Sequence, residues 1–430
     1  MSETAKVIER LRAFESRNVN FFEPDGSWPI VWERARGVHV WDAEGKKYLD
    51  LTAAFGVAAA GHANPAVVKA GQNQMATLLH AMGDVHPHGL KAALAEKLSQ
   101  LTFQRWSQQP AKTIFGCSGF EAVEAALKSA ILATQKRGVI AFEGGYHGLG
   151  YGALNATHRD YFRRPFQSQL REFGHFVTFP RKPADLPTVE FQIRHFFRRE
   201  RVGAILVEPV QARGGIHVPP PGFLPLLRKL CDESGALLIL DEIYTGFGRT
   251  GKWFACEHSG VVPDLVCLGK ALTGGFPLSA CVGRASLMDA AWPASPGEAM
   301  HTSTFLGHPV GCAMALAQIG EIEKLRLPDR SAELGGFLVD ELSTLAARIE
   351  HLQCAGRGVG LMAALELNLP DGRPATQPAL AAIKTLLQRG YIFLPEGEHG
   401  NVISFTPPLT ITGEDLTRAV EELAEVLNPS

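Results

Sequence analysis

Two residues of opposite charge stand at comparable places in the sequence. Asp241 ends the apolar run 236–240, and Lys270 follows a second apolar run at 265–268. Both runs are typical of buried strands, and in open α/β sheets ligands bind at the carboxyl ends of strands. A lysine that forms an imine and a carboxylate that keeps a pyridine nitrogen protonated suit pyridoxal 5′-phosphate. Each residue also has an ordinary interpretation, because such an Asp often caps a turn and a single Lys is usually solvated.

A second feature that could bind this cofactor is the start of a predicted helix. Ser118 with Glu121 three positions later is a capping-box pattern, and residues 119–135 have helical periodicity. The free N–H groups and positive dipole end of such a helix suit a phosphate group. An ordinary capped helix has the same pattern, so the pattern alone leaves both interpretations open.

The elements that position these residues alternate between strand and helix. Apolar strands are predicted at 113–115, 139–142, 204–207, 236–240 and 265–268, and a helix at 222–234 ends on Gly235. This alternation predicts an α/β fold whose large domain, residues 62–312, has a mostly parallel sheet with right-handed crossovers.

The chain ends have a different pattern. A hairpin is predicted around residues 42–45, strands at 359–367, 391–394 and 402–405, and helices at 309–325, 331–350, 379–388 and 414–427. These elements predict a smaller α+β domain built from residues 1–61 and 313–430.

Composition favours a cytoplasmic enzyme. The 430 residues are 46% hydrophobic and 20% charged, and the net charge of −2 argues against nucleic-acid or strong membrane partners. The polar start has no secretory pattern, no apolar run could span a bilayer, and the seven cysteines lack paired spacing. His80, His86 and His88 lie close in sequence, but no cysteine or carboxylate completes a ligand set, so we expect no metal site.

With these pieces assembled, the sequence resembles the class III (omega) pyridoxal-phosphate-dependent aminotransferases, enzymes of the aspartate-aminotransferase-like fold, PLP fold type I. The resemblance covers about residues 25–425. It rests on motifs that occur in the family's order: SGFEAVEAALK, YHG, VEPVQ, LILDEIYTGFGRTG, PDLVCLGKALTGGFPLSA, HTSTF and PPLTIT.

The resemblance implies roles for individual residues. Lys270 resembles the Schiff-base lysine and proton carrier, and Asp241 the partner of the pyridinium nitrogen. Thr304 resembles a threonine that reaches the phosphate of a neighbouring subunit, which implies a homodimer or a larger assembly with active sites at the subunit interface. The remaining cofactor-binding residues implied are Tyr146 on the ring, Ser118, Gly119 and Phe120 around the phosphate, and Glu208 in the pocket.

The sequence departs from the family pattern at five positions. Phe120 stands where members often have Thr, and Tyr244, near the cofactor's phenolic oxygen, stands where they often have Gln. Leu149 replaces an Arg of members that act on 4-aminobutyrate or ornithine. Arg213 replaces a Glu and Ser404 the Arg that pairs with it, so the switch that accepts 2-oxoglutarate is expected to be absent.

These departures lead to a hypothesis about the substrate. Arg213 is either a guanidinium clamp for a carboxylate or a solvated surface arginine, and the sequence favours neither. Phe55 and Trp28 are expected to make the pocket bulky and apolar, which favours an amine or a long-chain amino donor over a diacid.

The function predicted is ping-pong transamination from an amine, omega-amino acid or amino acid donor to a keto acid. A racemase or aminomutase of the same family is the alternative, because the motifs report the cofactor and not which bond breaks. A nucleotide-binding module is disfavoured because no G-x-G-x-x-G follows the first strand. The donor and the acceptor are not predicted.

Overall fold

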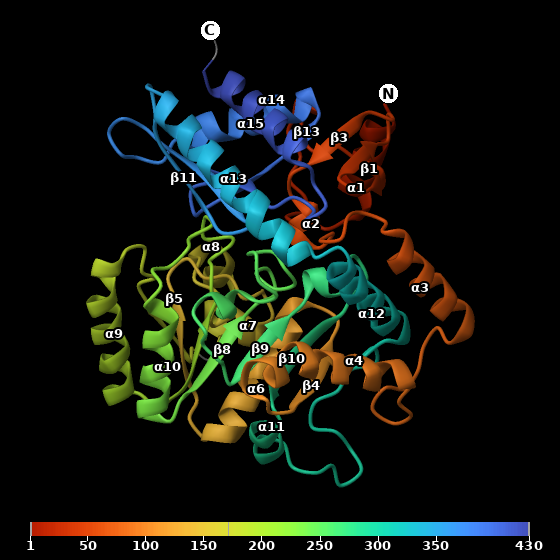
Figure 1. The fold of residues 1–430 in the computed structure, drawn as a ribbon, viewed down its shortest axis with the longest axis vertical. Helices are drawn as coiled ribbons and strands as arrows, with labels where there is room; N and C mark the ends of the chain where they lie inside the picture. The colour runs from red at the N-terminus through yellow and green to blue at the C-terminus, as the bar shows by residue number, and fades with distance from the viewer. Residues whose placement is uncertain (1, 171, 429–430) are drawn as a thin grey trace.

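The computed structural model describes residues 2–170 and 172–428, which form three sheets. A seven-stranded sheet with its helices forms the lower part of Figure 1, and the two chain ends lie together above it. Both four-stranded sheets come from the chain ends.

The large sheet has the strand order β4-β10-β9-β8-β7-β5-β6. Strands β5 to β9 run parallel to one another, whereas β10 is antiparallel to both β4 and β9. The mostly parallel sheet was predicted, but β6 and β10 were not. The strands are β4 (Ala111–Gly116), β5 (Gly138–Phe142), β6 (Gly174–Val177), β7 (Val202–Val207), β8 (Leu237–Asp241), β9 (Leu265–Leu268) and β10 (Ser279–Arg284).

Both faces of this sheet are covered. Alternate residues of β8 belong to different hydrophobic clusters, since Leu238 and Leu240 pack with α10 (Phe223–Ser234) and Ile239 packs with α6 (Gly119–Thr134). Burial on both faces explains why the strands are continuous apolar runs. The other helices of this part are α3 (Pro65–Thr77), α4 (Gly89–Leu101), α5 (Phe103–Ser107), α7 (Tyr151–Leu154), α8 (Asp160–Arg163), α9 (Leu186–Arg199), α11 (Ala285–Ala291) and α12 (Pro309–Lys324), with short 3-10 turns at Arg164–Gln169, Pro183–Asp185, Ala255–His258 and Lys270–Leu272.

The chain ends pair with each other. Strand β3 (Lys47–Asp50) runs antiparallel to β2 (His39–Asp42), as the hairpin prediction requires, and parallel to β13 (Tyr391–Ile392). The strand predicted at 359–367 begins four residues later than expected, as β12 from Ala363. A separate strand, β11, ends just before it at Gly358. The remaining elements are β1 (Trp32–Arg36), β11 (Gln353–Gly358), β12 (Ala363–Asn368), β14 (Leu394–Glu396), β15 (Val402–Phe405), α1 (Glu3–Phe14), α2 (Ala53–Gly56), α13 (Leu327–Arg348), α14 (Thr376–Arg389) and α15 (Gly413–Leu427).

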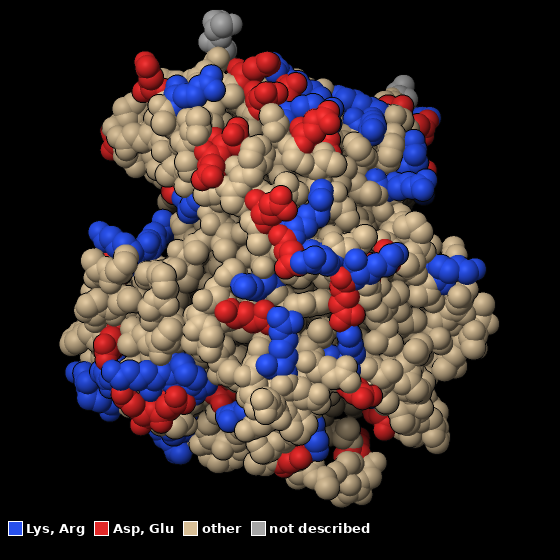
Figure 2. Space-filling view, in the orientation of Figure 1, with Lys and Arg blue, Asp and Glu red and all other residues tan. Residues whose placement is uncertain are grey.

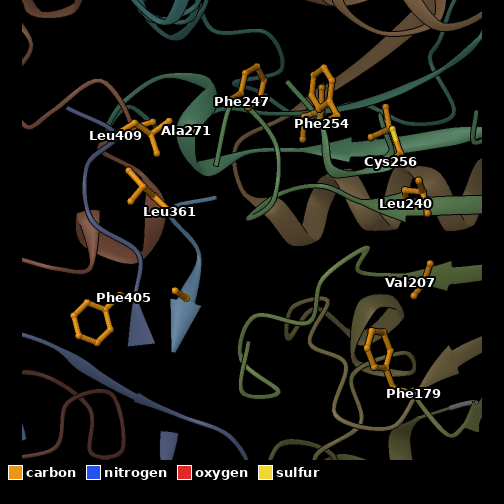
Figure 3. Packing of buried hydrophobic residues seen from close by; sticks show 14 of the residues in the cluster. Phe179, Val207, Leu240, Phe247, Phe254, Cys256, Ala271, Leu361, Phe405 and Leu409 are labelled. Carbon is orange, nitrogen blue, oxygen red and sulfur yellow. The ribbon is translucent and has the colours of Figure 1, made fainter. Parts of the chain in front are cut away.

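One hydrophobic cluster runs from the large sheet into the chain ends. Figure 3 shows Leu361 and Leu409, from the C-terminal part, close to Ala271, which follows Lys270. The buried Arg249 crosses the same boundary, because its Nη1 donates to the carbonyls of Leu361 at 2.8 Å and Pro407 at 2.6 Å. The turn that carries Lys270 and Ala271 therefore packs against the C-terminal part of the chain as well as against the large sheet.

The surface bears charges of both signs without a large patch of one sign on the face in Figure 2. Among the described helices, none is long and apolar enough to cross a membrane. Within residues 2–170 and 172–428, no three His, Cys, Asp or Glu side chains gather in the arrangement of a metal site. His88 instead starts α4 and bonds through Nε2 to the carbonyl of Gly307 at 2.7 Å.

Candidate active site

Lys270 lies just beyond β9 with an unusual backbone. Its φ is +40°, in the left-handed region that residues other than glycine seldom adopt, and such strain is concentrated at functional sites. Its Nζ lies 4.3 Å from the centroid of the Tyr244 ring. Burial lowers the pKa of Lys270, against the raising effect of the Asp241 and Glu208 charges. The neutral, nucleophilic amine is therefore easier to form here than in water.

Asp241 ends β8 and is held by two partners. Its Oδ2 lies 2.7 Å from His147 Nδ1, and its Oδ1 accepts the N–H of Ile243 at 3.1 Å. Burial alone would lower the pKa of His147, but the hydrogen bond and charge of Asp241 raise it above its ordinary value. The backbone N–H of His147 donates to Thr157 Oγ1 at 2.9 Å. The carboxylate is therefore fixed in orientation, and it favours the protonated form of the buried His147 imidazole.

Lys270 and Asp241 line one cavity of about 380 Å³. The sequence predicted that these two residues meet, and the structure brings them together. Other predicted site residues share this lining: Gly119, Phe120, Tyr146, Glu208, Arg213 and Tyr244, with His147, Gly148, Leu149, Ala212 and Ile243 beside them.

The start of α6 fits a phosphate group. Ser118 N–H donates to the Glu121 carboxylate at 3.3 Å, and the first N–H groups of a helix have no partner within it. Ser118 Oγ is buried without a hydrogen-bond partner in the described part of the chain. A Cβ on Gly119 would lie 3.0 Å from Ile243 Cδ1, so the backbone is closely packed against the loop after β8. These are the properties of a cradle for an anion.

Glu208 ties two cavity loops together. Its Oε1 accepts the N–H of Tyr146 at 2.9 Å and its Oε2 accepts the N–H of Ala212 at 3.0 Å. Burial raises the pKa of Glu208. Its visible contacts therefore position the half-buried Tyr146 ring and the loop that leads to Arg213.

Tyr244 is buried, and its ring packs against the Lys270 amine. Its hydroxyl bonds to Thr406 Oγ1 at 3.1 Å, and burial raises its pKa to about 12. A Cβ on Gly56 would lie 2.8 Å from the Tyr244 ring. The segment before Gly56 contains Phe55 in a left-handed conformation, with φ +60°, and the side chain is exposed.

Arg213 lies at one side of the cavity with its guanidinium 5.4 Å from the centre of the Tyr146 ring. Its Nε has no hydrogen-bond partner within the described chain. Its carbonyl accepts from Arg159 Nη2 at 2.7 Å and from the N–H of Gly397 at 3.1 Å. The backbone of Arg213 is therefore fixed while its side chain stays available.

The structure does not bring every predicted residue to this cavity. Trp28 packs against Val40 and Tyr48 in the N-terminal sheet. Phe55 and Thr304 are exposed and lie outside the lining, and Ser118 is next to it. Ser404 is buried and donates to the carbonyl of Leu394 at 3.1 Å.

Two residues at the site, His147 and Thr157, had no assigned role from the sequence. His147 lies within the YHG motif, which was a usable signal, since a histidine is a natural partner for a buried carboxylate. Thr157 carried no signal. Glu396, the last residue of β14, is buried but is not among the residues that line this cavity.

Comparison with known proteins identifies the family. The model of the family described as aminotransferase class-III matches residues 22–427. The chain belongs to this family. It is 39% identical to a putrescine aminotransferase of Pectobacterium atrosepticum, over 94% of this chain and 83% of that enzyme. It is 37% identical to an acetylornithine aminotransferase of Methanosarcina mazei, over 93% of this chain and 92% of the relative.

Solved structures of transaminases have the same fold as this chain. An amine transaminase from an uncultivated Pseudomonas species, crystallised in its PLP-bound form, has a TM-score of 0.86 and 29% identity, over 96% of this chain and 98% of its own. The fold-class prediction is confirmed, and the chain is an aminotransferase. The isomerase alternative finds no support among these relatives.

Proposed function

We propose that the cavity binds pyridoxal 5′-phosphate through Lys270 and transfers an amino group from an amine or amino acid donor to a keto acid in two half-reactions. The observation that carries this proposal is that Lys270 shares one cavity with Asp241, which is held by His147, and with the start of α6. A PLP-bound relative of the same fold supports the choice of cofactor.

When bound, the cofactor supplies an aldehyde for Lys270 and a ring that withdraws electrons from the donor's reacting carbon. The Lys270 amine, whose pKa burial lowers, would move a proton from that carbon to C4′ of the cofactor, and would move it in the opposite direction when the keto acid reacts in the second half-reaction. Asp241 would hold the ring nitrogen of the bound cofactor, and its fixed negative charge would need no reorganisation during the reaction. Ser118, Gly119 and the N–H of Phe120 hold the phosphate.

Arg213 is proposed as the site for the acceptor's carboxylate. Its guanidinium lines the cavity, its Nε is unpaired within the described residues, and a planar guanidinium suits a carboxylate. The apolar lining contributed by Phe120 and Leu149 favours donors that lack a second carboxylate. The names of the relatives, which include putrescine and acetylornithine aminotransferases, agree with a donor that carries a terminal amine.

Borohydride reduction tests the cofactor assignment. Reduction should attach the cofactor irreversibly to Lys270, abolish its visible-edge absorbance and shift the mass of the peptide containing Lys270. The variant Lys270→Ala should show neither change. An adduct on another lysine, or no adduct after loading with the cofactor, would overturn the assignment.

The reaction itself is tested by separate half-reactions. An amino donor alone should convert the cofactor to its aminated form, and a keto acid alone should restore it. Racemisation of an amino acid without consumption of a keto acid would instead support the isomerase alternative.

We propose that the active assembly is a homodimer in which Thr304 reaches the partner's phosphate. The exposed Thr304 is followed by Phe305, which is 54% exposed, and His80 packs edge-on against Phe305 with ring centres 5.4 Å apart. Leu79 and Met82 add exposed apolar surface nearby in sequence. Light scattering should give twice the chain mass of 46.5 kDa.

We propose further that residues 62–312 form the large cofactor-binding domain, and that residues 1–61 and 313–430 form the smaller one. The composition of the sheets supports this division, because the seven-stranded sheet uses residues 111–284 and both small sheets use the chain ends. Cytoplasmic location is likewise proposed, from the composition of the chain.

A further inference from the structure

Tyr244 presents the face of its ring, and not its hydroxyl, to the reacting amine. Lys270 Nζ lies 4.3 Å from the centroid of this ring, and both residues line the same cavity. The phenol oxygen is bonded to Thr406 Oγ1 at 3.1 Å, and the Thr406 hydroxyl donates to the carbonyl of Thr52 at 3.3 Å. Because each hydroxyl has one proton, the phenol donates its own to Thr406 and keeps none for the cofactor's phenolic oxygen.

The backbone of residues 53–56 is shaped around the Tyr244 ring. Ala53, Ala54 and Phe55 all have positive φ, and Gly56 follows with φ +78°. A Cβ at Gly56 would lie only 2.8 Å from Tyr244 Cε1. Left-handed residues other than glycine are costly and persist only where the surrounding structure fixes them. The position of the ring is therefore set by two segments that are far apart in the sequence.

The acidic groups that act on the Lys270 amine are engaged elsewhere. Burial lowers the pKa of Lys270, the charges of Asp241, Glu208 and Glu396 raise it, and the charge of Arg213 lowers it. Asp241 and Glu208 direct their oxygens to a histidine and to backbone N–H groups. The ring of Tyr244 is in direct contact with Nζ, and an aromatic face attracts an ammonium within about 6 Å of its centroid.

We propose that the face of Tyr244 receives the Lys270 ammonium when a donor amine has displaced it from the cofactor. This inference rests on the proposed aminotransferase function and assigns Tyr244 to the exchange of amines. In that exchange the donor nitrogen forms the bond to the aldehyde carbon that Nζ gives up. With the linking nitrogen protonated before and after, two protons pass from the donor ammonium to Nζ. The released amine then stays beside the carbon from which it takes its next proton.

The test measures the exchange without turnover. The carbon of tert-butylamine that bears the nitrogen carries no hydrogen, so this amine can displace Lys270 but cannot go on to proton transfer. Borohydride fixes whichever nitrogen is bonded to the cofactor, and mass spectrometry gives the ratio of amine adduct to Lys270 adduct. Tyr244→Leu should lower the equilibrium constant for exchange by about threefold to thirtyfold, the effect of one desolvated cation–π contact.

Two further variants separate the ring from the hydroxyl. Tyr244→Phe keeps the aromatic face and loses only the bond to Thr406, so its exchange constant should stay within about twofold of wild type. Tyr244→Gln removes the ring and supplies the amide that the family often has at this position. It should show the same loss as Tyr244→Leu, and it keeps the test available if the leucine variant does not fold.

A matched control removes another buried tyrosine. Tyr48 is 3% exposed in the N-terminal sheet, and its hydroxyl donates to Asp42 Oδ2 at 2.7 Å. Tyr48→Leu should lower the thermal stability of the protein and leave the exchange constant unchanged.

A second readout needs no cofactor. Acetic anhydride modifies only the neutral amine, so the pH dependence of Lys270 acetylation in the cofactor-free chain reports the pKa of Lys270. The aromatic face favours the charged form, so this pKa should be about 0.5 to 1.5 units lower in Tyr244→Leu than in wild type. Tyr244→Phe should leave it unchanged.

Different results would overturn the assignment. An exchange constant that is the same in wild type, Tyr244→Leu and Tyr244→Gln would exclude the ring from the exchange. A loss in Tyr244→Phe as large as that in Tyr244→Leu would assign the effect to the hydroxyl, and an equal loss in Tyr48→Leu would assign it to general loosening of the fold. A wild-type chain that forms no Lys270 adduct would refute the proposed function instead, whereas the acetylation profile would still decide whether Tyr244 holds the ammonium.

Discussion

Replacing Asp241 by Asn tests the central electrostatic argument with almost no change in shape. The Asn side chain can still accept the N–H of Ile243, which now lies 3.1 Å from Oδ1. The atom 2.7 Å from His147 Nδ1 would belong to a neutral amide, so the fixed negative charge is lost and the pKa of His147 should fall. The cavity keeps its volume while its electrostatics change.

The expected loss follows from the role of a preorganised charge. Removing one group that stabilises the developing charge of a transition state costs about 3 to 4 kcal/mol, which corresponds to roughly a hundredfold to a thousandfold in rate. The weakened contact with His147 adds about 1.5 to 3 kcal/mol of local destabilisation, the value of one charge-assisted hydrogen bond. Asp241→Asn should therefore retain less cofactor and react more slowly per bound cofactor.

The assay separates these two effects. Cofactor content is measured by release in alkali, and single-turnover decay of the cofactor absorbance with saturating donor gives the rate for each loaded site. Asp264→Asn is the matched control, because Asp264 is also buried in this sheet but bonds to Arg228 Nη1 at 2.7 Å and to the N–H of Leu238 at 2.8 Å. It should lower thermal stability and leave the loaded-site rate unchanged.

Loaded Asp241→Asn that reacts within threefold of wild type would refute the reasoning. A loss in Asp264→Asn as large as that in Asp241→Asn would show that general loosening of the sheet, and not the charge at the ring nitrogen, sets the rate.

Three further predictions use other parts of the site. Arg213→Met should raise the KM for keto acids by about tenfold to a hundredfold, with the donor half-reaction nearly unchanged in stopped-flow traces. Gly56→Ala, at φ +78° with its new Cβ 2.8 Å from the Tyr244 ring, should destabilise the fold by roughly 1 to 3 kcal/mol in denaturant titrations monitored by fluorescence. Ser118→Ala should weaken cofactor retention by about tenfold in dialysis, and unchanged retention would remove its hydroxyl from the phosphate site.

Much of the fold was predictable because its strands are buried on both faces. Runs such as residues 237–240 are apolar throughout and end abruptly on Asp241, so both the strand and a candidate site residue are visible in the sequence. The helix predicted at 309–325 is found as α12 (Pro309–Lys324). Its signals were a long helical pattern and a proline at its first position.

The elements that were missed lack such signals. Strand β6 has only the residues GHFV, in a segment rich in Arg and Phe, and β10 has the small residues of SACVGR. Both become strands because neighbouring strands supply their hydrogen-bond partners, which is a tertiary effect. The hydrophobic pattern of β10 does not indicate that this strand runs antiparallel to its neighbours.

The same distinction explains the site. Asp241 and Lys270 end strands of one sheet, so strand order alone brings them close. Trp28, predicted near the substrate, packs against Val40 and Tyr48 of the N-terminal sheet. Contacts between sheets depend on how the layers dock, which local sequence does not encode.

The parallel pair formed by Leu49 with Tyr391 has a consequence for biosynthesis. The N-terminal hairpin leaves the ribosome well before the strand that completes its sheet, because Tyr391 follows Leu49 by 342 residues (391 − 49). Until then its edge is open to pairing with other chains, which is a hazard for aggregation. Such distant closure also slows folding. Nascent chains stalled before β13 should therefore need a chaperone to keep this edge covered.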